Sequence, residues 1–239
     1  MKLKYIVLFS GIAFLSLTAC EGQKNKETKT AMTTTADSVS YAIGISIGGN
    51  LKKDNLDEIN VDLIADGIKA AMKNDSSIMN MNVAQSSIQG FMQGREKKKG
   101  EANIERGKKF LEDNAKKEGV KTTASGLQYQ IVKEGTGPKP ALTDKVSVHY
   151  HGTLVDGKVF DSSVERGQPA EFGVNQVIPG WTEALQMMPV GSKWKLWIPS
   201  NIAYGERSPG GSIGPNETLI FEVELLAIVP AAPPKEPGK

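Results

Sequence analysis

Residues 146–163 read "VSVHYHGTLVDGKVFDSS", a stretch whose pattern predicts two antiparallel strands joined by a tight turn. Alternate positions from Val146 to Leu154 are apolar or small, and the positions between them are polar. This period of two is typical of a strand that buries one face. Asp156-Gly157 follows directly, and this dipeptide favours a hairpin turn. We therefore expect the stretch to form a β-hairpin within an antiparallel sheet.

The second arm of this hairpin places an aromatic residue, Phe160, directly before a carboxylate, Asp161. No nucleophile, metal shell or phosphate-binding loop accompanies this pair in the neighbouring sequence. Arg166 follows Asp161 closely, and we expect Asp161 both to pair with it and to serve a functional site. His149 and His151 share one strand face, but no third metal ligand can be placed beside them. They are expected to face solvent.

Three further strands and one short helix are predicted in the same half of the chain. The strands lie in "LQYQIV", "SKWKLWIPS" and "TLIFEVELLAIV", and the helix lies in "PGWTEALQMM", where Pro179 marks its start. A long loop, "NIAYGERSPGGSIGPNE", precedes the last strand. The alternation in the second strand assigns residues to two faces, with Trp194, Leu196 and Ile198 inward and Lys193, Lys195 and Trp197 outward. This half is predicted to be α+β, a curved antiparallel sheet wrapped over a short helix.

The other half is predicted to be all-helical, because no proline occurs from Ser38 up to a change in composition near 119–126. Apolar residues at helical spacing predict one helix in "VDLIADGIKAAM" and another beginning near Asn82. The second helix would have about 35 residues and extend on the order of 50 Å. Its charged middle includes Gly100 and Gly107, which each cost about 1 kcal/mol relative to alanine. We therefore expect a solvated stalk helix, or one that bridges two bodies.

One segment near the N-terminus is compatible with either regular structure. "SVSYAIGISIGG" alternates apolar residues from Val39 to Ile47, as a strand would. Ile43, Ile47 and Leu51 also fit one face of a helix. Periodicity alone leaves both structures open.

The first 20 residues resemble the export signal of a bacterial lipoprotein. A basic start and a short apolar run end in "LTAC", and Cys20 is the only cysteine of the chain. The resemblance implies that residues 1–19 are a signal peptide and that Cys20 carries a lipid anchor in the bacterial cell envelope, at the outer membrane. The alternative is an unmodified cysteine near an ordinary cleavage site. Loss of Lys2 and Lys4 with the signal leaves a neutral chain, which argues against nucleic acid as a partner.

Composition divides the remainder of the chain into four parts. Polar residues 20–37 are expected to form a disordered tether, and the Pro-rich residues 230–239 are expected to form a disordered tail. Between them, residues 38–120 are predicted to be a helical domain with its stalk helix. Residues 121–229 are predicted to be the α+β domain.

The second half resembles the FKBP-type peptidyl-prolyl cis–trans isomerases. The resemblance rests on the order and spacing of "VHYHGTLVDGKVFDSS", "VIPGWTEALQMMPVG", "AYG" and "ETLIFEVELL". The first half, including "SVSYAIGISIGGNL" and the long charged helix, resembles the dimerisation domain and stalk of macrophage infectivity potentiator-like lipoproteins and periplasmic FKBP-type proteins. This resemblance implies that the ambiguous segment is helical and that the protein is a homodimer.

The resemblance also implies a pocket for proline-containing polypeptides, lined by Tyr150, Phe160, Asp161, Val177, Ile178, Trp181, Tyr204, Ile213 and Phe221. The Trp181 indole would form its floor. The Ile178 backbone N–H and the Tyr204 hydroxyl would hold substrate carbonyl groups. Ala170 and Pro209 depart from the best-known members, and both changes widen or reshape the rim where substrates and macrolide inhibitors would bind.

Rotation about an X–Pro amide suits these residue types and needs no cofactor. The barrier is about 20 kcal/mol because resonance keeps the amide planar, and no bond has to break. A dry aromatic pocket disfavours the more polar planar form, and oriented polar groups such as Asp161 stabilise the twisted carbonyl. The expected function is prolyl isomerisation in folding envelope proteins, with chaperone activity. The alternatives are a non-catalytic holdase or a surface-interaction lipoprotein, with the aromatic residues as plain core.

Overall fold

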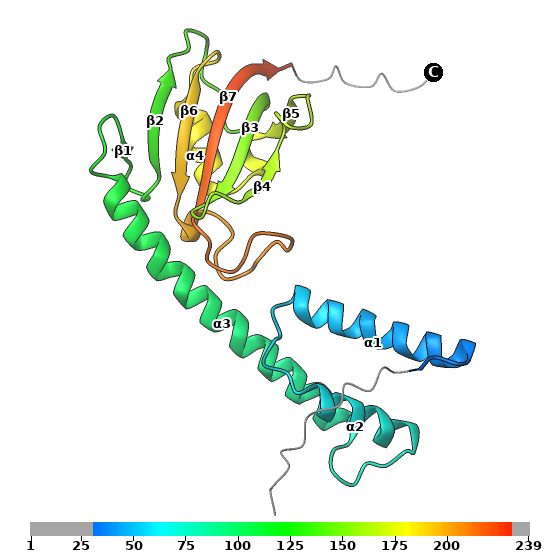
Figure 1. Cartoon of the computed structure of the whole chain (residues 1–239). Coiled ribbons are helices and arrows are strands. Elements are labelled where there is room, and N and C mark those ends of the chain that lie inside the picture. The colour runs from blue at the N-terminus through cyan, green and yellow to red at the C-terminus, as the bar shows by residue number, and fades with distance from the viewer. Residues whose placement is uncertain (1–30, 231–239) are drawn as a thin grey trace, which may run out of the picture. The chain divides into compact units, whose positions relative to one another are not determined.

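The computed structural model describes residues 31–230. The expectations for the signal peptide, for Cys20 and for residues 231–239 lie outside these residues. The chain divides into two compact units, with the division between Asp75 and Ser76. Figure 1 shows the helices and strands that belong to each unit.

The first unit contains α1 (Thr35–Lys53) and α2 (Val61–Met72). A capping box begins α1: the Asp37 N–H donates to the Thr34 hydroxyl at 3.1 Å, and the Thr34 N–H donates to the Asp37 carboxylate at 2.8 Å. These two bonds satisfy N–H groups that a helix start otherwise leaves free. The helix therefore begins three residues before the predicted start at Ser38, and the predicted tether 20–37 extends too far.

The ambiguous N-terminal segment is helical, because α1 covers all of it. The helix predicted in "VDLIADGIKAAM" is confirmed as α2, whose start is capped by the Asn60 side chain. No residue of α1 or α2 is buried. Large apolar side chains on these helices are instead exposed, namely Val39, Tyr41, Ile43, Ile45, Val61, Leu63, Ile68 and Met72. Helices of this length gain most of their stability by packing an apolar face, and within a single chain these faces are uncovered.

The second unit begins with the predicted long helix, α3 (Met81–Asn114), which has 34 residues. The sequence left two roles open for α3, a solvated stalk or a bridge between two bodies, and its C-terminal half is not fully solvated. Four small or polar residues of that half are buried, Gly100, Asn103, Gly107 and Asn114. They pack against the sheet domain through polar contacts, which an apolar helix pattern does not reveal.

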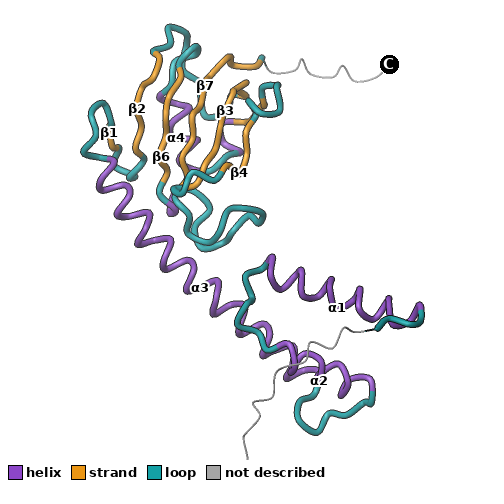
Figure 2. The backbone as a smooth tube through the Cα atoms, in the orientation of Figure 1, coloured by secondary structure: helices purple, strands orange, loops and turns teal. Residues whose placement is uncertain are grey.

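The sheet domain contains seven antiparallel strands in the order β1-β2-β6-β7-β3-β4, with β5 also pairing with β3 (Figure 2). The strands are β1 (Lys121–Thr122), β2 (Gln128–Lys133), β3 (Lys145–Leu154), β4 (Val159–Ser162), β5 (Ala170–Gly173), β6 (Lys193–Ile198) and β7 (Leu219–Val229). Between them lie α4 (Pro179–Met187) and two short 3-10 turns, η1 (Val174–Gln176) and η2 (Ser200–Ile202). The predicted α+β architecture is confirmed.

The opening hairpin forms as its sequence predicts. Along β3, Val146, Val148, Tyr150, Gly152 and Leu154 are buried, and the residues between them are half-buried. At the turn that leads into β4, the Gly157 N–H donates to the Leu154 carbonyl at 3.0 Å. Gly157 has a φ of 85°, a conformation that glycine adopts at little cost.

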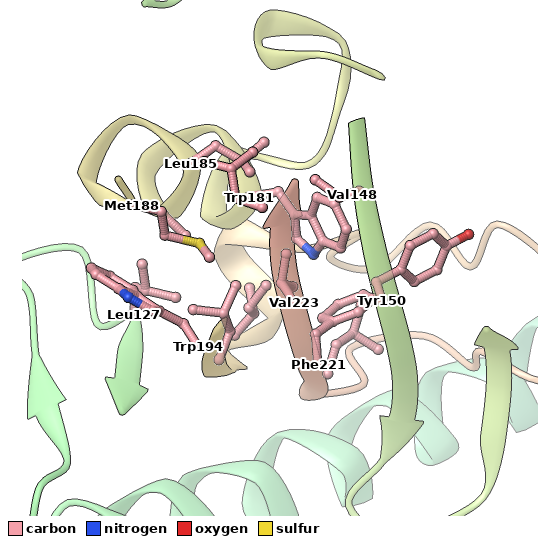
Figure 3. Close-up of a cluster of buried hydrophobic side chains, with 14 of the residues drawn as sticks. Leu127, Val148, Tyr150, Trp181, Leu185, Met188, Trp194, Phe221 and Val223 are labelled. Carbon is pink, nitrogen blue, oxygen red and sulfur yellow. The ribbon is translucent and has the colours of Figure 1, made fainter. Parts of the chain in front are cut away.

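The hydrophobic core lies between the sheet and α4. Figure 3 shows Trp181, Leu185 and Met188 gathered against side chains of the sheet such as Val223. Pro179 occupies the first turn of α4, where its missing N–H costs no hydrogen bond. The core side of the sheet and the short helix therefore fix the position of Trp181.

Trp197 faces outward from the core, as predicted, but it is covered. It lies on the face of β6 opposite the core, yet it is only 5% exposed. Its register partners are Gln128 on β2 and Ile220 on β7. The Gln128 amide donates to the Leu111 carbonyl of α3, and Asn114 donates to the Gln128 side-chain oxygen, each at 2.9 Å. The end of α3 thus joins this face of the sheet, which the alternation within β6 alone cannot show.

Candidate functional site

A cavity of about 400 Å³ opens beside α4. It is lined by Tyr150, Phe160, Asp161, Phe172, Gln176, Val177, Ile178, Trp181, Tyr204 and Phe221. Strands β3, β4, β5 and β7, the turn η1, the start of α4 and the loop after η2 all contribute. The lining is mostly aromatic and aliphatic with a few polar groups, as in sites that bind small or extended ligands.

Trp181 is the centre of the aromatic cluster around this cavity. Its ring meets those of Tyr150, Phe172 and Phe221 edge to face, at centroid distances of 5.4, 5.8 and 5.1 Å. Such pairs contribute about 0.5–1.5 kcal/mol each beyond the burial of their area. The indole is 4% exposed, and its buried Nε1 has no acceptor among the residues that the structure describes. Packing alone therefore fixes the ring.

Gly152 in the middle of β3 allows the other two rings to approach. A Cβ atom at this position would lie 2.7 Å from Phe160 Cζ and 2.9 Å from Phe221 Cε1. Both distances are shorter than van der Waals contact, so a larger residue would displace the rings. Phe160 and Phe221 meet edge to face with their centroids 5.4 Å apart. The glycine therefore shapes the apolar wall of the cavity.

A polar cluster of three side chains lies at the edge of the cavity. The Tyr150 hydroxyl and the Arg166 guanidinium both donate hydrogen bonds to the Asp161 carboxylate. The guanidinium also donates to the Tyr150 hydroxyl at 2.8 Å and lies 5.6 Å from the centroid of the Tyr150 ring. In Figure 3 the Tyr150 hydroxyl points away from the buried cluster. The predicted Asp161–Arg166 pair is therefore confirmed.

These contacts keep Asp161 ionised. Partial burial acts to raise the pKa of Asp161, but hydrogen bonds from Tyr150 and Arg166 outweigh it and hold the pKa below its usual value. Burial and the negative charge of Asp161 both raise the pKa of Tyr204, so its phenol stays protonated and able to donate. Burial, reinforced by the hydrogen bond to Asp161, likewise raises the pKa of Tyr150. The cavity edge thus combines a fixed negative charge with neutral phenols.

Two donors remain available at the cavity. The backbone N–H of Ile178, the residue that precedes the first turn of α4, makes no backbone hydrogen bond among residues 31–230. Its carbonyl already accepts hydrogen bonds from the N–H groups of Trp181 and Thr182. Tyr204 is 43% exposed, and its side chain lines the same cavity.

The structure brings all but one of the predicted site residues to this cavity. The exception is Ile213, which packs in the hydrophobic core and does not line the cavity. Ala170 also packs against the core, while Phe172, two residues later on β5, lines the cavity. Phe172 was missed because β5 is short and shows no clear alternation, and Gln176 was missed because it lies in the short turn η1. The pairing of β5 with β3 is what brings Phe172 beside Tyr150.

The two histidines lie on the other face of β3. His149 Nδ1 is 3.2 Å from the Ser163 hydroxyl, and His151 Nδ1 is 3.0 Å from the Ser162 hydroxyl. Both are half-buried instead of fully solvent-facing as predicted. The described residues hold no group of three or more side chains that could bind a metal. They also include no helix long and apolar enough to cross a membrane.

Comparison with known proteins identifies the class to which this fold and cavity belong. Residues 137–226 match the model of the FKBP-type peptidyl-prolyl cis–trans isomerase. Residues 36–131 match the model of the domain amino terminal to FKBP-type peptidyl-prolyl isomerase. The chain therefore belongs to the FKBP-type peptidyl-prolyl cis–trans isomerases, in the branch that carries this amino-terminal domain.

Particular relatives agree with this assignment over most of the chain. The chain is 45% identical to the outer membrane protein MIP of Legionella longbeachae over 210 residues, which cover 85% of this chain and 90% of the relative. It is 48% identical to the FKBP-type 22 kDa peptidyl-prolyl cis–trans isomerase of Escherichia coli K12 over 193 residues, 80% of this chain and 94% of that protein. The crystal structure of FkpA from Escherichia coli superposes with a TM-score of 0.65 at 36% identity, covering 84% of this chain and all of that one.

Proposed function

We propose that the cavity around Trp181 binds the proline of an X–Pro peptide and lowers the barrier to rotation about the preceding amide bond. The observation that carries this proposal is an aromatic cavity with one ionised carboxylate, Asp161, fixed at its edge by Tyr150 and Arg166. Rotation about an amide breaks no bond, so the cavity needs no nucleophile to catalyse it.

The apolar wall supplies the first part of the effect. A planar amide is stabilised by resonance that separates charge between oxygen and nitrogen, and water solvates this form well. The buried rings of Trp181 and Phe221 offer the amide no such solvation, so the less polar twisted amide is relatively favoured. Each 1.4 kcal/mol removed from the barrier gives about a tenfold gain in rate.

Oriented polar groups supply the second part. The Ile178 N–H and the Tyr204 hydroxyl hold substrate carbonyl oxygens, and this anchors the chain on both sides of the rotating bond. Asp161 presents its charge to the carbonyl carbon, which is more electrophilic once conjugation with nitrogen is lost. Because Arg166 and Tyr150 already hold the carboxylate, little reorganisation is needed during rotation.

The helices α1 and α2 and the beginning of α3 are each proposed to contribute to a homodimer interface. The support is the set of exposed apolar side chains on α1 and α2, together with Val83, Ile88, Phe91 and Met92 on α3. A second copy of the same helices presents the same apolar surface and can cover it symmetrically. Two cavities in one dimer would give a long unfolded client a second binding event at high effective concentration. Chaperone activity on folding envelope proteins is proposed on this basis.

The protein is proposed to be held in the bacterial envelope by a lipid on Cys20. The support is the signal-like sequence before Cys20 and the polar stretch after it. One relative is named an outer membrane protein. Several acyl chains on one cysteine hold a protein at a membrane far more firmly than one chain does.

A non-catalytic holdase remains the second candidate, because the same exposed helical surface could grip unfolded clients without isomerisation. A prolyl-isomerisation assay with a short X–Pro peptide separates the two functions. Isomerase function predicts catalysed exchange between cis and trans that Asp161→Leu reduces. A protein that suppresses aggregation but leaves the peptide exchange rate at its uncatalysed value would support the holdase.

A further inference from the structure

The C-terminal half of α3 lies unusually close to the segment that enters β7. A Cβ atom on Gly107 would lie 2.2 Å from the Thr218 hydroxyl, and one on Gly100 would lie 3.0 Å from the Asn216 side-chain nitrogen. A Cβ atom on Gly107 would overlap the Thr218 side chain, and one on Gly100 would be in tight contact with the Asn216 side chain, although each glycine weakens the helix by about 1 kcal/mol relative to alanine. A helix that served only as a spacer would gain stability from alanine at both positions.

Side chains of α3 also bind this segment directly. Asn103 is 3% exposed, and its amide donates to the Pro215 carbonyl at 2.8 Å. The Arg106 guanidinium donates to both carboxylate oxygens of Glu217, at 2.9 and 3.1 Å, and to the Asn103 side-chain oxygen at 2.8 Å. Glu217 is only 7% exposed. A buried carboxylate needs such a partner, because it would otherwise lose its hydration without compensation.

The segment that α3 binds is connected to the cavity wall. The Asn216 N–H donates to the Gly205 carbonyl at 2.7 Å, and the Gly205 N–H donates to the Ser200 carbonyl at 2.9 Å. Gly205 directly follows Tyr204, which lines the cavity. Between them and β7 the chain forms no regular strand or helix, only an isolated bridge from Gly210 to Ile213. The backbone next to Tyr204 is therefore hydrogen-bonded to Asn216. The two neighbours of Asn216, Pro215 and Glu217, are bound by side chains of α3.

We propose that Arg106 and Asn103 are positioning residues for Tyr204, so that the stalk helix helps set the geometry of the isomerase cavity. This proposal rests on the proposed role of the Tyr204 hydroxyl. The sequence of contacts runs from Arg106 and Asn103 to residues 215–217, and from Asn216 to the backbone beside Tyr204. Loss of the α3 contacts frees the 205–216 loop, and the hydroxyl then spends less time where it can hold the substrate carbonyl.

The test uses the full chain with Arg106→Met, which keeps the length of the side chain and removes its donors. Hydrogen exchange is measured by NMR at the Asn216 amide, with the β3 amides as the reference for global stability. Exchange at Asn216 should rise about tenfold or more relative to those amides, because its hydrogen bond opens locally. The kcat/KM on a short X–Pro peptide should fall about tenfold, since small misplacement of a positioned group has effects of this size or larger.

A double-mutant cycle with Tyr204→Phe gives a readout that a merely structural role would not move. Once the Tyr204 hydroxyl is absent, Arg106→Met should reduce kcat/KM by less than about twofold further. Additive losses would overturn the proposal, and so would unchanged exchange at Asn216. If exchange responds as expected but the wild-type chain catalyses no isomerisation, the α3 link stands and the proposed function fails.

Two further variants serve as a control for the helix and as a safeguard against misfolding. Lys109→Met removes an exposed basic side chain from the same helix, where Lys109 acts electrostatically on Asp113, and it should leave both readouts unchanged. Arg106→Met alone leaves the buried Glu217 carboxylate without its partner, and combining it with Glu217→Gln removes that charge as well. If Arg106→Met alone does not fold, this pair must still show faster exchange at Asn216 and the lower kcat/KM. A pair with wild-type values for both would contradict the proposal.

Discussion

Gly152 in β3 lies directly opposite Asp161 in the β3–β4 ladder. The residue without a side chain and the carboxylate at the cavity edge are therefore cross-strand neighbours. Gly152 is also the register partner of Phe221 on β7. One backbone position thus connects the charged edge of the cavity with its aromatic wall.

Gly152→Ala should disturb the cavity more than the sheet. The added methyl group lies within 3 Å of the Phe160 and Phe221 rings, so the rings must shift. Overpacking of this kind costs about 1–3 kcal/mol of unfolding free energy. We expect a loss of that size in chemical denaturation and a larger KM for an X–Pro peptide. Thr153→Ala, on the other face of the same strand, is the matched control. Wild-type KM in Gly152→Ala would show that the ring positions are unimportant.

Removal of the polar groups should lower activity without unfolding the domain. Asp161→Leu and Tyr204→Ala are each expected to reduce kcat/KM by about tenfold or more, which corresponds to roughly 1.4 kcal/mol of transition-state stabilisation. Circular dichroism should show the wild-type fold in both. His151→Ala, on the face of β3 away from the cavity, should keep full activity. Full activity in both cavity variants would contradict the proposed roles.

The pH dependence follows from the direction of the pKa shifts. Asp161 has a lowered pKa, while Tyr150 and Tyr204 have raised ones, so none of these three groups titrates between about pH 5 and 9. We expect kcat/KM to be nearly flat between about pH 6 and 9. Because the folded pKa of Asp161 lies below its unfolded value, its contribution to stability is present above about pH 4 and is lost as the pH falls through the folded pKa. A bell-shaped profile centred near pH 7 would count against this account.

Truncation should separate the role of the proposed dimer interface from that of the C-terminal half of α3. A fragment of residues 95–230 keeps the α3 contacts but loses most of the exposed apolar surface, so it should be monomeric by light scattering. A fragment of residues 121–229, the predicted domain, is expected to fold but to be less stable, because Glu217 and Gln128 lose Arg106 and Asn114. Both should isomerise short peptides, but the 121–229 fragment should do so about tenfold more slowly because it lacks Arg106 and Asn103. Both should lose more activity on a proline-limited refolding protein. A dimeric 95–230 fragment would rule out the proposed interface.

Cys20→Ser should release the protein from the membrane fraction. Lipidation requires the thiol, and serine preserves the size of the side chain. The measurement is fractionation of expressing cells followed by immunoblotting. Wild-type sedimentation of the variant with membranes would show that the anchor is elsewhere.

Much of the fold was predictable because its main strands bury one face. The alternation in β3 and the turn at Gly157 give the hairpin directly, and the same pattern gives β7. The burial of Trp197 and the packing of α3 were not predictable in this way. Their partners are distant in sequence, and the α3 contact uses glycine and asparagine, which no apolar pattern marks. Gly107 counts only as a helix-weakening residue until Thr218 is placed beside it.

The candidate site shows the same division. Asp161 and Arg166 could be paired from their short separation, and the family resemblance supplied most of the cavity. Phe172 could not be found from the four residues of β5, and Ile213 was assigned to the cavity although it is not among the residues that line it. Both errors concern positions set by tertiary pairing rather than by local pattern.

The most direct test of the central claim is the rate of cis–trans exchange in a short X–Pro peptide, measured by NMR exchange spectroscopy with the wild-type chain and with Asp161→Leu at equal concentration. The account predicts that the wild type accelerates exchange in proportion to its concentration and that Asp161→Leu loses about nine-tenths or more of this acceleration, the tenfold effect expected above. Exchange at the uncatalysed rate with the wild type, or equal acceleration by both proteins, would contradict it.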